Sequence, residues 1–273
     1  MIDLAVLEHR SGVLPLTAAF FERGAMDEAV ADPKVGALGL FTPAPEPGFG
    51  AVALTGVAAD GGGLLVSGRI RLPSPAADGS IVPVRCADGE LRLAWLDHGS
   101  PGVERSVDGD GGGDGPCWLQ VEKAAIASGL VSRPVSLDPG SELVRSLAAY
   151  AGVWALAAAA VAREGVQSLR RAARTTGFNA SQWVALGITE VEIEADLTFA
   201  AAKRNPGLAV AAAAARTLAA VAARTEELRG SMGLEADGPL AGGSAKVLTA
   251  YLGGALLLEA ELARALGIGE ARA

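Results

Sequence analysis

The sequence has few of the residues that enzymes use as nucleophiles, acids and bases. Its 273 residues include two cysteines and two histidines, and aromatic residues make up 4%. Cys86 and Cys117 form no CxxC pair and no zinc-ligand spacing, so we expect no metal site and a reducing, cytoplasmic environment. His9 and His98 have no evident partner. We expect both at the surface, which leaves serine–histidine–aspartate chemistry little support.

The sequence also lacks an excess of basic residues and any long, strongly apolar run. A net charge of −8 argues against a nucleic-acid partner, which normally requires a basic surface. No basic region precedes an apolar run at the N-terminus, so no secretion signal is predicted. The apolar stretches at residues 148–162 and 247–258 are shorter than the roughly 18 residues that a membrane span needs. We therefore expect a soluble protein with no membrane partner.

Half of the residues are hydrophobic, and many of the alanines occur in the second half of the chain. There, apolar residues recur at steps of three and four, which is typical of one buried face on a helix. The predicted helices cover residues 144–169, 181–203, 208–228 and 245–266. Residues 189–197 alternate as in a strand, but their glutamates and flanking alanines favour helix. Short connections between long helices predict a four-helix bundle.

Helical periodicity is absent between residues 36 and 139. Short β-prone runs alternate there with Gly, Pro and Asp clusters, which predicts a small antiparallel β-domain. The predicted strands are residues 37–41, 51–58, 64–72, 80–86, 91–97 and 117–121. Residues 1–35 look helical, including 14–21 and 26–31. The fold class is therefore α+β, with a helical segment at 1–35, a β-domain at 36–139 and a bundle at 140–273.

An acidic, glycine-rich stretch at residues 108–115 could suggest a calcium loop, because Ca²⁺ prefers oxygen ligands. However, Gly112 occupies a position at which an EF-hand has a ligand, and no glutamate closes a twelve-residue loop. We interpret the stretch as the tip of a hairpin. No phosphate-binding loop is recognisable.

Several motifs occur in one order along nearly the whole chain and together resemble the acyl-CoA dehydrogenase family. Residues 39–43 (GLFTP) resemble its "LTEP" strand, and residues 60–69 (DGGGLLVSGR) resemble a glycine-rich hairpin. Arg174 and Phe178 match the end of the first bundle helix. The remaining similar segments are residues 190–202, residues 229–234 (RGSMGL) and residues 244–253 (SAKVLTAYLG).

The resemblance implies an FAD bound between subunits and an acyl thioester whose α-proton is removed by a carboxylate base. This chain departs from that pattern at important positions. Leu252 stands where the family has its catalytic glutamate, and an apolar side chain cannot accept a proton. The glutamate of "LTEP" is missing. The N-terminal helical domain that encloses the acyl chain in the family is mostly absent.

Two carboxylates could replace the missing base. Glu235 and Asp237 follow the glycine-rich turn, and either could act as a base if burial beside a flavin raised its pKa. The alternative is that both carboxylates are solvated on an exposed turn.

The resemblance also assigns a candidate cofactor-binding set. Arg174 would pair with the flavin pyrophosphate, whose oxygens match a guanidinium fork. Alternatively it is a solvated cation at a helix C-terminus. The other candidates are Phe178, Gly230, Ser231 and Gly233, of which the glycines would permit a tight turn.

Three functions remain open from the sequence. The chain could be a degenerate partner subunit of a heteromeric, FAD-dependent acyl-CoA dehydrogenase. It could be a self-sufficient flavoenzyme with its base at Glu235 or Asp237. It could also be a homo-oligomeric scaffold or binding protein that has lost the flavin.

Overall fold

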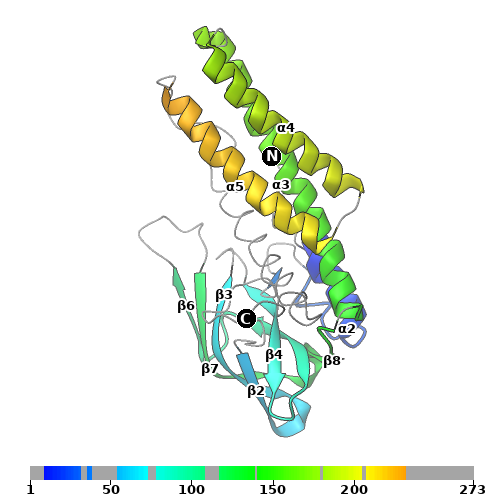
Figure 1. Ribbon diagram of the computed structural model, residues 1–273. Coiled ribbons are helices and arrows are strands. Elements are labelled where there is room, and N and C mark those ends of the chain that lie inside the picture. Colours follow the sequence, from blue (N-terminus) through cyan, green and yellow to red (C-terminus); the bar gives the residue numbers. More distant parts are fainter. Residues whose placement is uncertain are drawn as a thin grey trace, which may run out of the picture. The chain divides into compact units, whose positions relative to one another are not determined.

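The computed structural model describes residues 9–31, 36–38, 54–72, 78–107, 117–138, 140–178, 181–204 and 207–231. The chain divides into two compact units, with a boundary between Tyr150 and Ala151 (Figure 1). The first unit contains a short helix, a sheet and the start of the longest helix, and the second contains the remaining helical structure. The domain boundaries expected after residues 35 and 139 stay predictions. The predicted helix at 245–266 lies outside the described residues.

The N-terminal segment is helical over a shorter stretch than predicted. A π-helical turn, His9–Val13, is followed by α2, Leu14–Phe20, which buries Leu16 and Phe20. Residues 26–31 form turns, so the helix predicted there is wrong. Gly24 has a left-handed φ of +84° at the start of this stretch. The short run that follows cannot offset the cost of starting a new helix.

His9 is buried, contrary to the surface position expected from the sequence. Its side chain is 6% exposed, and its Nε2 lies 2.7 Å from the carbonyl oxygen of Val30. Because a carbonyl can only accept, the imidazole donates from Nε2. His9 thus holds the turn segment against the first helical turns, which is a structural role.

Eight described strands form one sheet with the order β6-β7-β3-β2-β4-β5-β8, and β1 pairs with β4. The expectation of a purely antiparallel sheet is wrong, because β4 pairs in parallel with both β1 and β2. β3 already pairs with β2 on one side and β7 on the other, so β4 is placed on the free side of β2. The strands are β1, Gly36–Leu38; β2, Leu54–Ala58; β3, Leu64–Leu72; β4, Gly79–Cys86; β5, Leu91–Asp97; β6, Val103–Val107; β7, Cys117–Ile126; and β8, Val131–Val135.

Strand β7 shows how the sheet separates its two faces. Cys117, Leu119 and Val121 alternate inward at every second residue, as a strand requires. A bulge opposite Ser67 then adds one residue, and Lys123 adopts a φ of +50° with its N–H donating to the Ser67 hydroxyl at 3.0 Å. After the bulge Ala124 and Ile126 again point inward. The sheet core includes Leu54, Leu72, Val82, Val84, Leu96 and Leu119, each at most 1% exposed.

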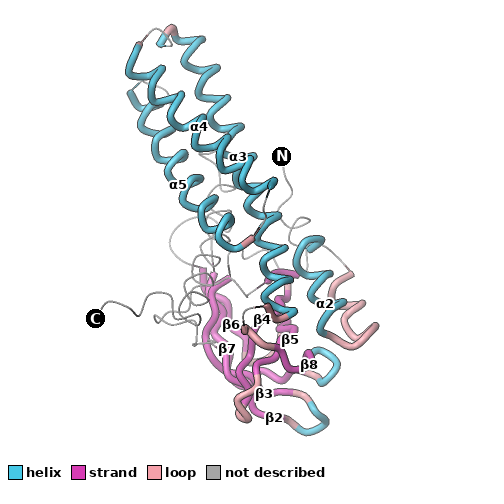
Figure 2. Tube along the Cα trace, turned by 45° about the vertical axis from the view of Figure 1, so that its right-hand side comes forward, coloured by secondary structure: helices cyan, strands magenta, loops and turns pink. Residues whose placement is uncertain are grey.

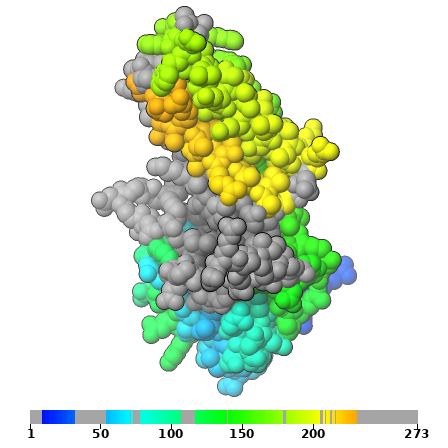
Figure 3. All heavy atoms as spheres, in the orientation of Figure 1, coloured from blue at the N-terminus to red at the C-terminus, as the bar shows by residue number. Residues whose placement is uncertain are grey.

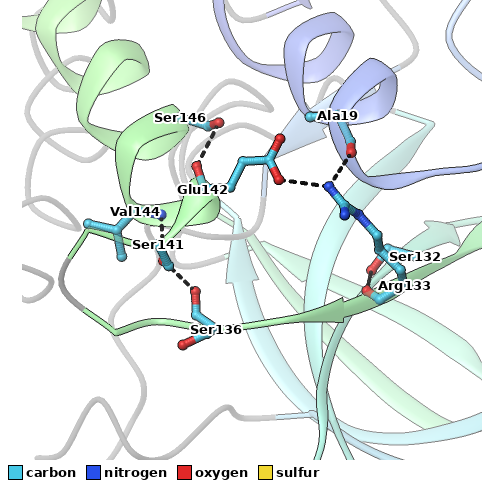
Figure 4. Close-up of polar contacts among 8 residues, drawn as sticks. All are labelled: Ala19, Ser132, Arg133, Ser136, Ser141, Glu142, Val144 and Ser146. Atoms are coloured by element: carbon cyan, nitrogen blue, oxygen red, sulfur yellow. Dashed lines mark hydrogen bonds and ion pairs between the residues drawn. The ribbon is translucent and has the colours of Figure 1, made fainter.

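Arg133 of β8 connects three elements of the first unit (Figure 4). Its guanidinium donates to the carbonyl of Ala19 at 3.1 Å and to the Glu142 carboxylate at 2.7 Å. It also lies 5.6 Å from the centre of the Phe20 ring. Ala19 lies in the last turn of α2, where the helix leaves its carbonyls unpaired. Arg133 therefore supplies a partner for α2 and links it to the start of α3.

We expect Arg133→Ala to lower the free energy of unfolding of the first unit by about 1 kcal/mol, because the contact is solvent-exposed and screened. Urea unfolding followed by circular dichroism would measure this. Arg145→Ala is the matched control, since Arg145 is an exposed arginine in the first turn of α3, the helix that Arg133 contacts through Glu142, and has no side-chain partner among the described residues. Equal losses in the two variants would contradict a specific role for Arg133.

Three long helices are described. The first begins in the first unit and continues into the second, and the other two lie in the second unit. They are α3, Glu142–Thr176; α4, Gln182–Arg204; and α5, Leu208–Ser231. The Ser141 hydroxyl accepts the N–H of Val144 at 3.2 Å and caps the start of α3. Residues 189–197 are helical, which confirms that interpretation over the alternating strand pattern. The helices lie alongside one another in alternating directions (Figure 2).

Small residues let α4 and α5 pack closely. The buried residues of α5 repeat at steps of three and four: Ala211, Ala214, Leu218, Val221, Thr225 and Leu228. Opposite them on α4, Gly187 is so near that an added Cβ would lie 3.1 Å from the Leu228 side chain. Thr198 donates a hydrogen bond to Thr217 at 3.0 Å. Alanine and glycine along the seam bring the two backbones together.

By length and composition alone, α3 could cross a membrane, with a mean hydropathy of 1.5 in its most apolar window. However, 56% of that window is buried within the protein. Arg163 and Arg170 on the same helix form ion pairs with Asp196 and Glu192 of α4. These features are typical of a core helix, and we interpret α3 as one.

Candidate functional site

The fold brings the described members of the predicted cofactor set to one end of the helical unit. An ion pair between Arg170 and Glu192 joins the last third of α3 to the middle of α4. α4 in turn contacts the last turns of α5 at Gly187. Because the helices alternate in direction, α3 and α5 end where α4 begins (Figure 1). Arg174 and Gly230 therefore lie at the same end.

Arg174 and Phe178 are both exposed at the end of α3. Arg174 lies in the last turn and forms no ion pair within the described part of the chain. Gly177, with a left-handed φ of +76°, ends the helix. The Phe178 ring is 39% exposed, and the Phe178 carbonyl accepts the N–H of Ser181 at 2.9 Å. An exposed guanidinium and an exposed ring thus stand beside the turn that leads into α4.

The first turn of α4 adds a second feature suited to an anion. Its initial N–H groups have no partner inside the helix, and the helix dipole is positive at this end. The intrahelical bonds begin where Ala185 donates to the carbonyl of Ser181 at 2.9 Å. A helix N-terminus beside an unpaired arginine is an arrangement that binds phosphate oxygens. Arg174 and the start of α4 therefore fit a pyrophosphate.

Trp183 and Arg224 extend this end of the unit, and their contact has no signature in the sequence. The Arg224 guanidinium lies 5.2 Å from the centre of the Trp183 ring and pairs with Glu227 at 2.5 Å. The two residues are on different helices, so only the packing of α5 on α4 brings them together. Trp183 is 46% exposed.

Gly230 does not form the predicted turn. α5 continues through Gly230 to Ser231, and the φ of Gly230 is not left-handed. A glycine weakens a helix by about 1 kcal/mol but does not end it unless the chain there adopts a left-handed conformation. The helix predicted to stop near residue 228 is three residues longer. Gly230 and Ser231 lie at the same end of the helical unit as Arg174, and their role in cofactor binding stays a prediction.

The other predicted site residues lie outside the described residues. These are Gly233, the candidate bases Glu235 and Asp237, and Leu252 at the position of the family's glutamate. The "LTEP"-like residues 39–43, which follow β1, also lie outside the described residues. The same holds for the acidic stretch at 108–115, between β6 and β7. Their proposed roles stay predictions.

His98 has partners in the structure but is not arranged as a base. Arg105 lies 2.8 Å from His98 Nδ1, and His98 Nε2 lies 3.0 Å from the hydroxyl of Ser80. Because a guanidinium can only donate, Nδ1 accepts, and the neutral ring has its hydrogen on Nε2. His98 therefore donates to Ser80 and cannot remove its proton. The expectation that His98 is not a catalytic base agrees with this geometry. The expectation that His98 has no partner is wrong.

Neither thiol nor metal chemistry has support in the described residues. Burial raises the pKa of the Cys86 thiol, with Asp88 adding to the effect, so Cys86 is held in its unreactive neutral form. Within those residues, no group of three or more His, Cys, Asp or Glu side chains could hold a metal ion. The exposed end of the helical unit is thus the strongest candidate site.

Comparison with known proteins rests on structure, since no protein-family model and no curated protein matches the sequence. One chain in the structure of the ChsE4–ChsE5 complex from Mycobacterium tuberculosis is similar to this protein. The match covers 99% of this chain and 80% of that chain, with a TM-score of 0.66 and 19% identity. The chain has an acyl-CoA dehydrogenase-like fold. Butyryl-CoA dehydrogenase from Megasphaera elsdenii matches 96% of this chain and 76% of its own, with a TM-score of 0.71 and 15% identity.

A third dehydrogenase is a flavin complex. Glutaryl-CoA dehydrogenase from Mycobacterium smegmatis, in complex with FADH2, matches 97% of this chain and 75% of its own, with a TM-score of 0.72 and 14% identity. Identities this low establish the acyl-CoA dehydrogenase-like fold alone. The resemblance inferred from the motifs is confirmed at that level.

Proposed function

We propose that the protein is a partner subunit of a heteromeric, FAD-dependent acyl-CoA dehydrogenase acting on an acyl thioester. In this proposal the chain supplies part of a flavin site, and a catalytic subunit supplies the base that the sequence lacks at Leu252. The likeness to the ChsE4–ChsE5 complex supports pairing with a second, different subunit.

The observation that most supports this proposal is the open end of the helical unit. Arg174 and the Phe178 ring are exposed beside the start of α4, although both types of side chain usually gain stability by contact. Arg174 has no anionic partner among the described side chains. A site completed by another molecule would explain a guanidinium and a ring presented to solvent at a helix N-terminus.

The residues present suggest a division of roles. FAD, when bound, would supply the hydride acceptor. Arg174 would orient the pyrophosphate through charge-assisted hydrogen bonds, and the α4 N–H groups would add a positive potential. Phe178 would exclude water from one side of the bound group. None of these groups can accept the substrate's α-proton, so in this proposal they contribute to binding and not to the chemical step.

The test is the visible absorption spectrum of the purified protein, alone and co-purified with a neighbouring acyl-CoA dehydrogenase-like subunit. We expect flavin bands in the complex only, and Arg174→Ala in the complex should weaken flavin binding about tenfold. Arg216→Ala is the matched control. Arg216 is also exposed but lies 14 residues before Gly230, or about 20 Å along α5, and should leave flavin content unchanged.

The remaining outcomes separate the other functions. Flavin bound by the chain alone, with turnover lost in Glu235→Gln or Asp237→Asn, would indicate a self-sufficient enzyme and contradict the partner proposal. A colourless protein in both preparations would indicate a scaffold that has lost the flavin.

A further inference from the structure

The N-terminal segment, residues 9–31, covers part of the first unit without joining its sheet. It consists of the π-helical turn, α2 and several turns, and none of its residues pairs with a strand. It nevertheless buries six large apolar side chains, each at most 8% exposed: Val13, Leu16, Phe20, Phe21, Met26 and Val30. Atoms of the segment, blue in Figure 3, reach the surface of the first unit. We call this segment the N-terminal strap, because its release would leave the strand pairing intact.

Two carbonyls of the N-terminal strap accept hydrogen bonds from side chains distant in the sequence. The Arg133 guanidinium of β8 donates to the carbonyl of Ala19. The His9 imidazole donates to the carbonyl of Val30 at 2.7 Å, and so joins the first described turn of the strap to its last. A guanidinium keeps its positive charge throughout the ordinary pH range, whereas an imidazole does not. His9 is therefore the contact that a change of pH can alter.

The surroundings of the His9 ring suit a neutral imidazole. The residue is 6% exposed, and the hydrogen on Nε2 is donated to Val30. The other nitrogen, Nδ1, is buried and has no hydrogen-bond partner among the described residues. Without a proton, Nδ1 is only an unused acceptor. With a proton, Nδ1 would be a buried donor that carries part of a positive charge and has no acceptor, which is much less favourable.

Charged groups near the ring do not offset that cost. Among the described elements, α2 and β1 pack around the π-helical turn that carries His9, and neither contains a charged residue. Arg133 on β8 is itself a cation and is bound to Glu142. The charged side chains of the strap are all exposed, and none of them bonds to the imidazole: Arg10, Glu22, Arg23, Asp27 and Glu28. In the described part of the chain, no carboxylate is placed to stabilise an imidazolium at His9.

We propose that His9 makes the N-terminal strap an acid-sensitive clasp, which is closed at neutral pH and released when the imidazole is protonated. Histidine ordinarily changes its charge between about pH 5 and pH 8. Water can hydrate both nitrogens of the released strap, so the released form takes up the proton more readily. The closed strap is therefore favoured above this range and lost as the pH falls through it. The clasp needs no flavin and no second subunit, so it is independent of the function proposed above.

Fluorescence anisotropy of a label on the strap tests this release in the full chain. Ala18 is exposed on α2, so Ala18→Cys accepts a fluorophore without disturbing the core. Cys86 and Cys117 are 8% and 0% exposed, so the label attaches mainly to the introduced thiol. We expect the anisotropy to fall reversibly as the pH is lowered from about 8 to about 5. Val57→Cys is the control, because Val57 is 59% exposed on β2 and a label there should keep its anisotropy.

Substitution of the two histidines assigns the response. With one proton taken up on release, the ratio of closed to released strap should fall about tenfold for each pH unit below the transition. His9→Gln keeps an N–H that can donate to the Val30 carbonyl but cannot gain a proton, so this strap should stay closed. His9→Phe has no titratable group, and its anisotropy should not depend on pH whether its strap is closed or open. His98→Gln, the matched control, removes the other histidine and should leave the response unchanged.

Four results would overturn the proposal. One is a constant anisotropy of the Ala18 label between about pH 8 and pH 5, and another is a pH response that survives in both His9 variants. Loss of the response in His98→Gln would assign it to the other histidine. A simultaneous change at the Val57 label would indicate unfolding of the sheet instead of release of the strap.

Discussion

Replacing Gly102 by alanine is expected to lower the free energy of unfolding of the sheet-containing unit by about 4 kcal/mol. Gly102 has a left-handed φ of +83°, and a Cβ there would lie 2.2 Å from the carbonyl oxygen of Glu122. Its own carbonyl accepts the N–H of Glu122 at 2.7 Å. The added methyl group would therefore meet the backbone that pairs β6 with β7, and a backbone atom cannot move aside as a side chain can.

Gly89→Ala separates the two causes of this loss. Gly89 has a similar φ of +88°, but nothing lies within 4 Å of a Cβ built there. We expect this variant to lose only about 1 kcal/mol, the cost of the left-handed conformation. Urea unfolding of both variants measures the difference. Equal losses would show that the contact with Glu122 relaxes and that backbone conformation alone sets the cost.

Replacing Trp154 by alanine should lower the free energy of unfolding by about 4 kcal/mol. Trp154 is 1% exposed in the middle of α3, and the adjoining buried positions on the helix are Ala151, Ala155 and Ala158. Small rigid neighbours cannot extend into the space that an indole vacates. The cost therefore includes both lost apolar burial and a cavity.

Trp154→Phe provides the comparison for this prediction. Phenylalanine keeps most of the buried area, so we expect a loss of about 1.5 kcal/mol. Unfolding is best followed by far-ultraviolet circular dichroism, because the substitution removes a fluorophore. Losses of the same size in the two variants would contradict a cavity as the main cause.

Strong local patterns made most of the first unit predictable. The limits of β3 and β5 match the sequence prediction residue for residue, because each is a short β-prone run bounded by glycine-containing turns. β6 and β8 could not be predicted in the same way. β6 reads Val-Glu-Arg-Ser-Val, with three polar residues inside, and β8 contains Pro134, which is disfavoured within strands. These two strands form the ends of the sheet order, where only one neighbour is needed.

The order of strands depends on tertiary pairing, which the sequence pattern does not encode. Turn residues predict that a chain reverses, but β4 pairs beside β2 and in parallel with it. Contacts between distant residues have the same limitation. The imidazole of His9 reaches Val30, and Arg133 reaches Ala19, through backbone carbonyls that have no sequence signature.

The grouping of Arg174 and Gly230 at one end of the helices was predictable, whereas their local conformation was less so. The short connection between α3 and α4 and the one between α4 and α5 place Arg174 and Gly230 at one end of the bundle. The sequence could not show that Gly230 is helical, because glycine occurs both inside and after helices. It also could not show Arg224 over Trp183, since that contact depends on the register of two helices.

The close seam between α4 and α5 also sets which mutations the second unit can accumulate. A methyl group added at Gly187 would lie 3.1 Å from the Leu228 side chain, and Ala211 and Ala214 are buried along the same seam. Exchange there is limited to residues of equally small volume, whereas exposed positions such as Thr189 and Ala219 have no such limit. A fold held by a few volume-restricted positions can diverge freely elsewhere. That tolerance is consistent with solved structures that share this architecture at 14% to 19% identity.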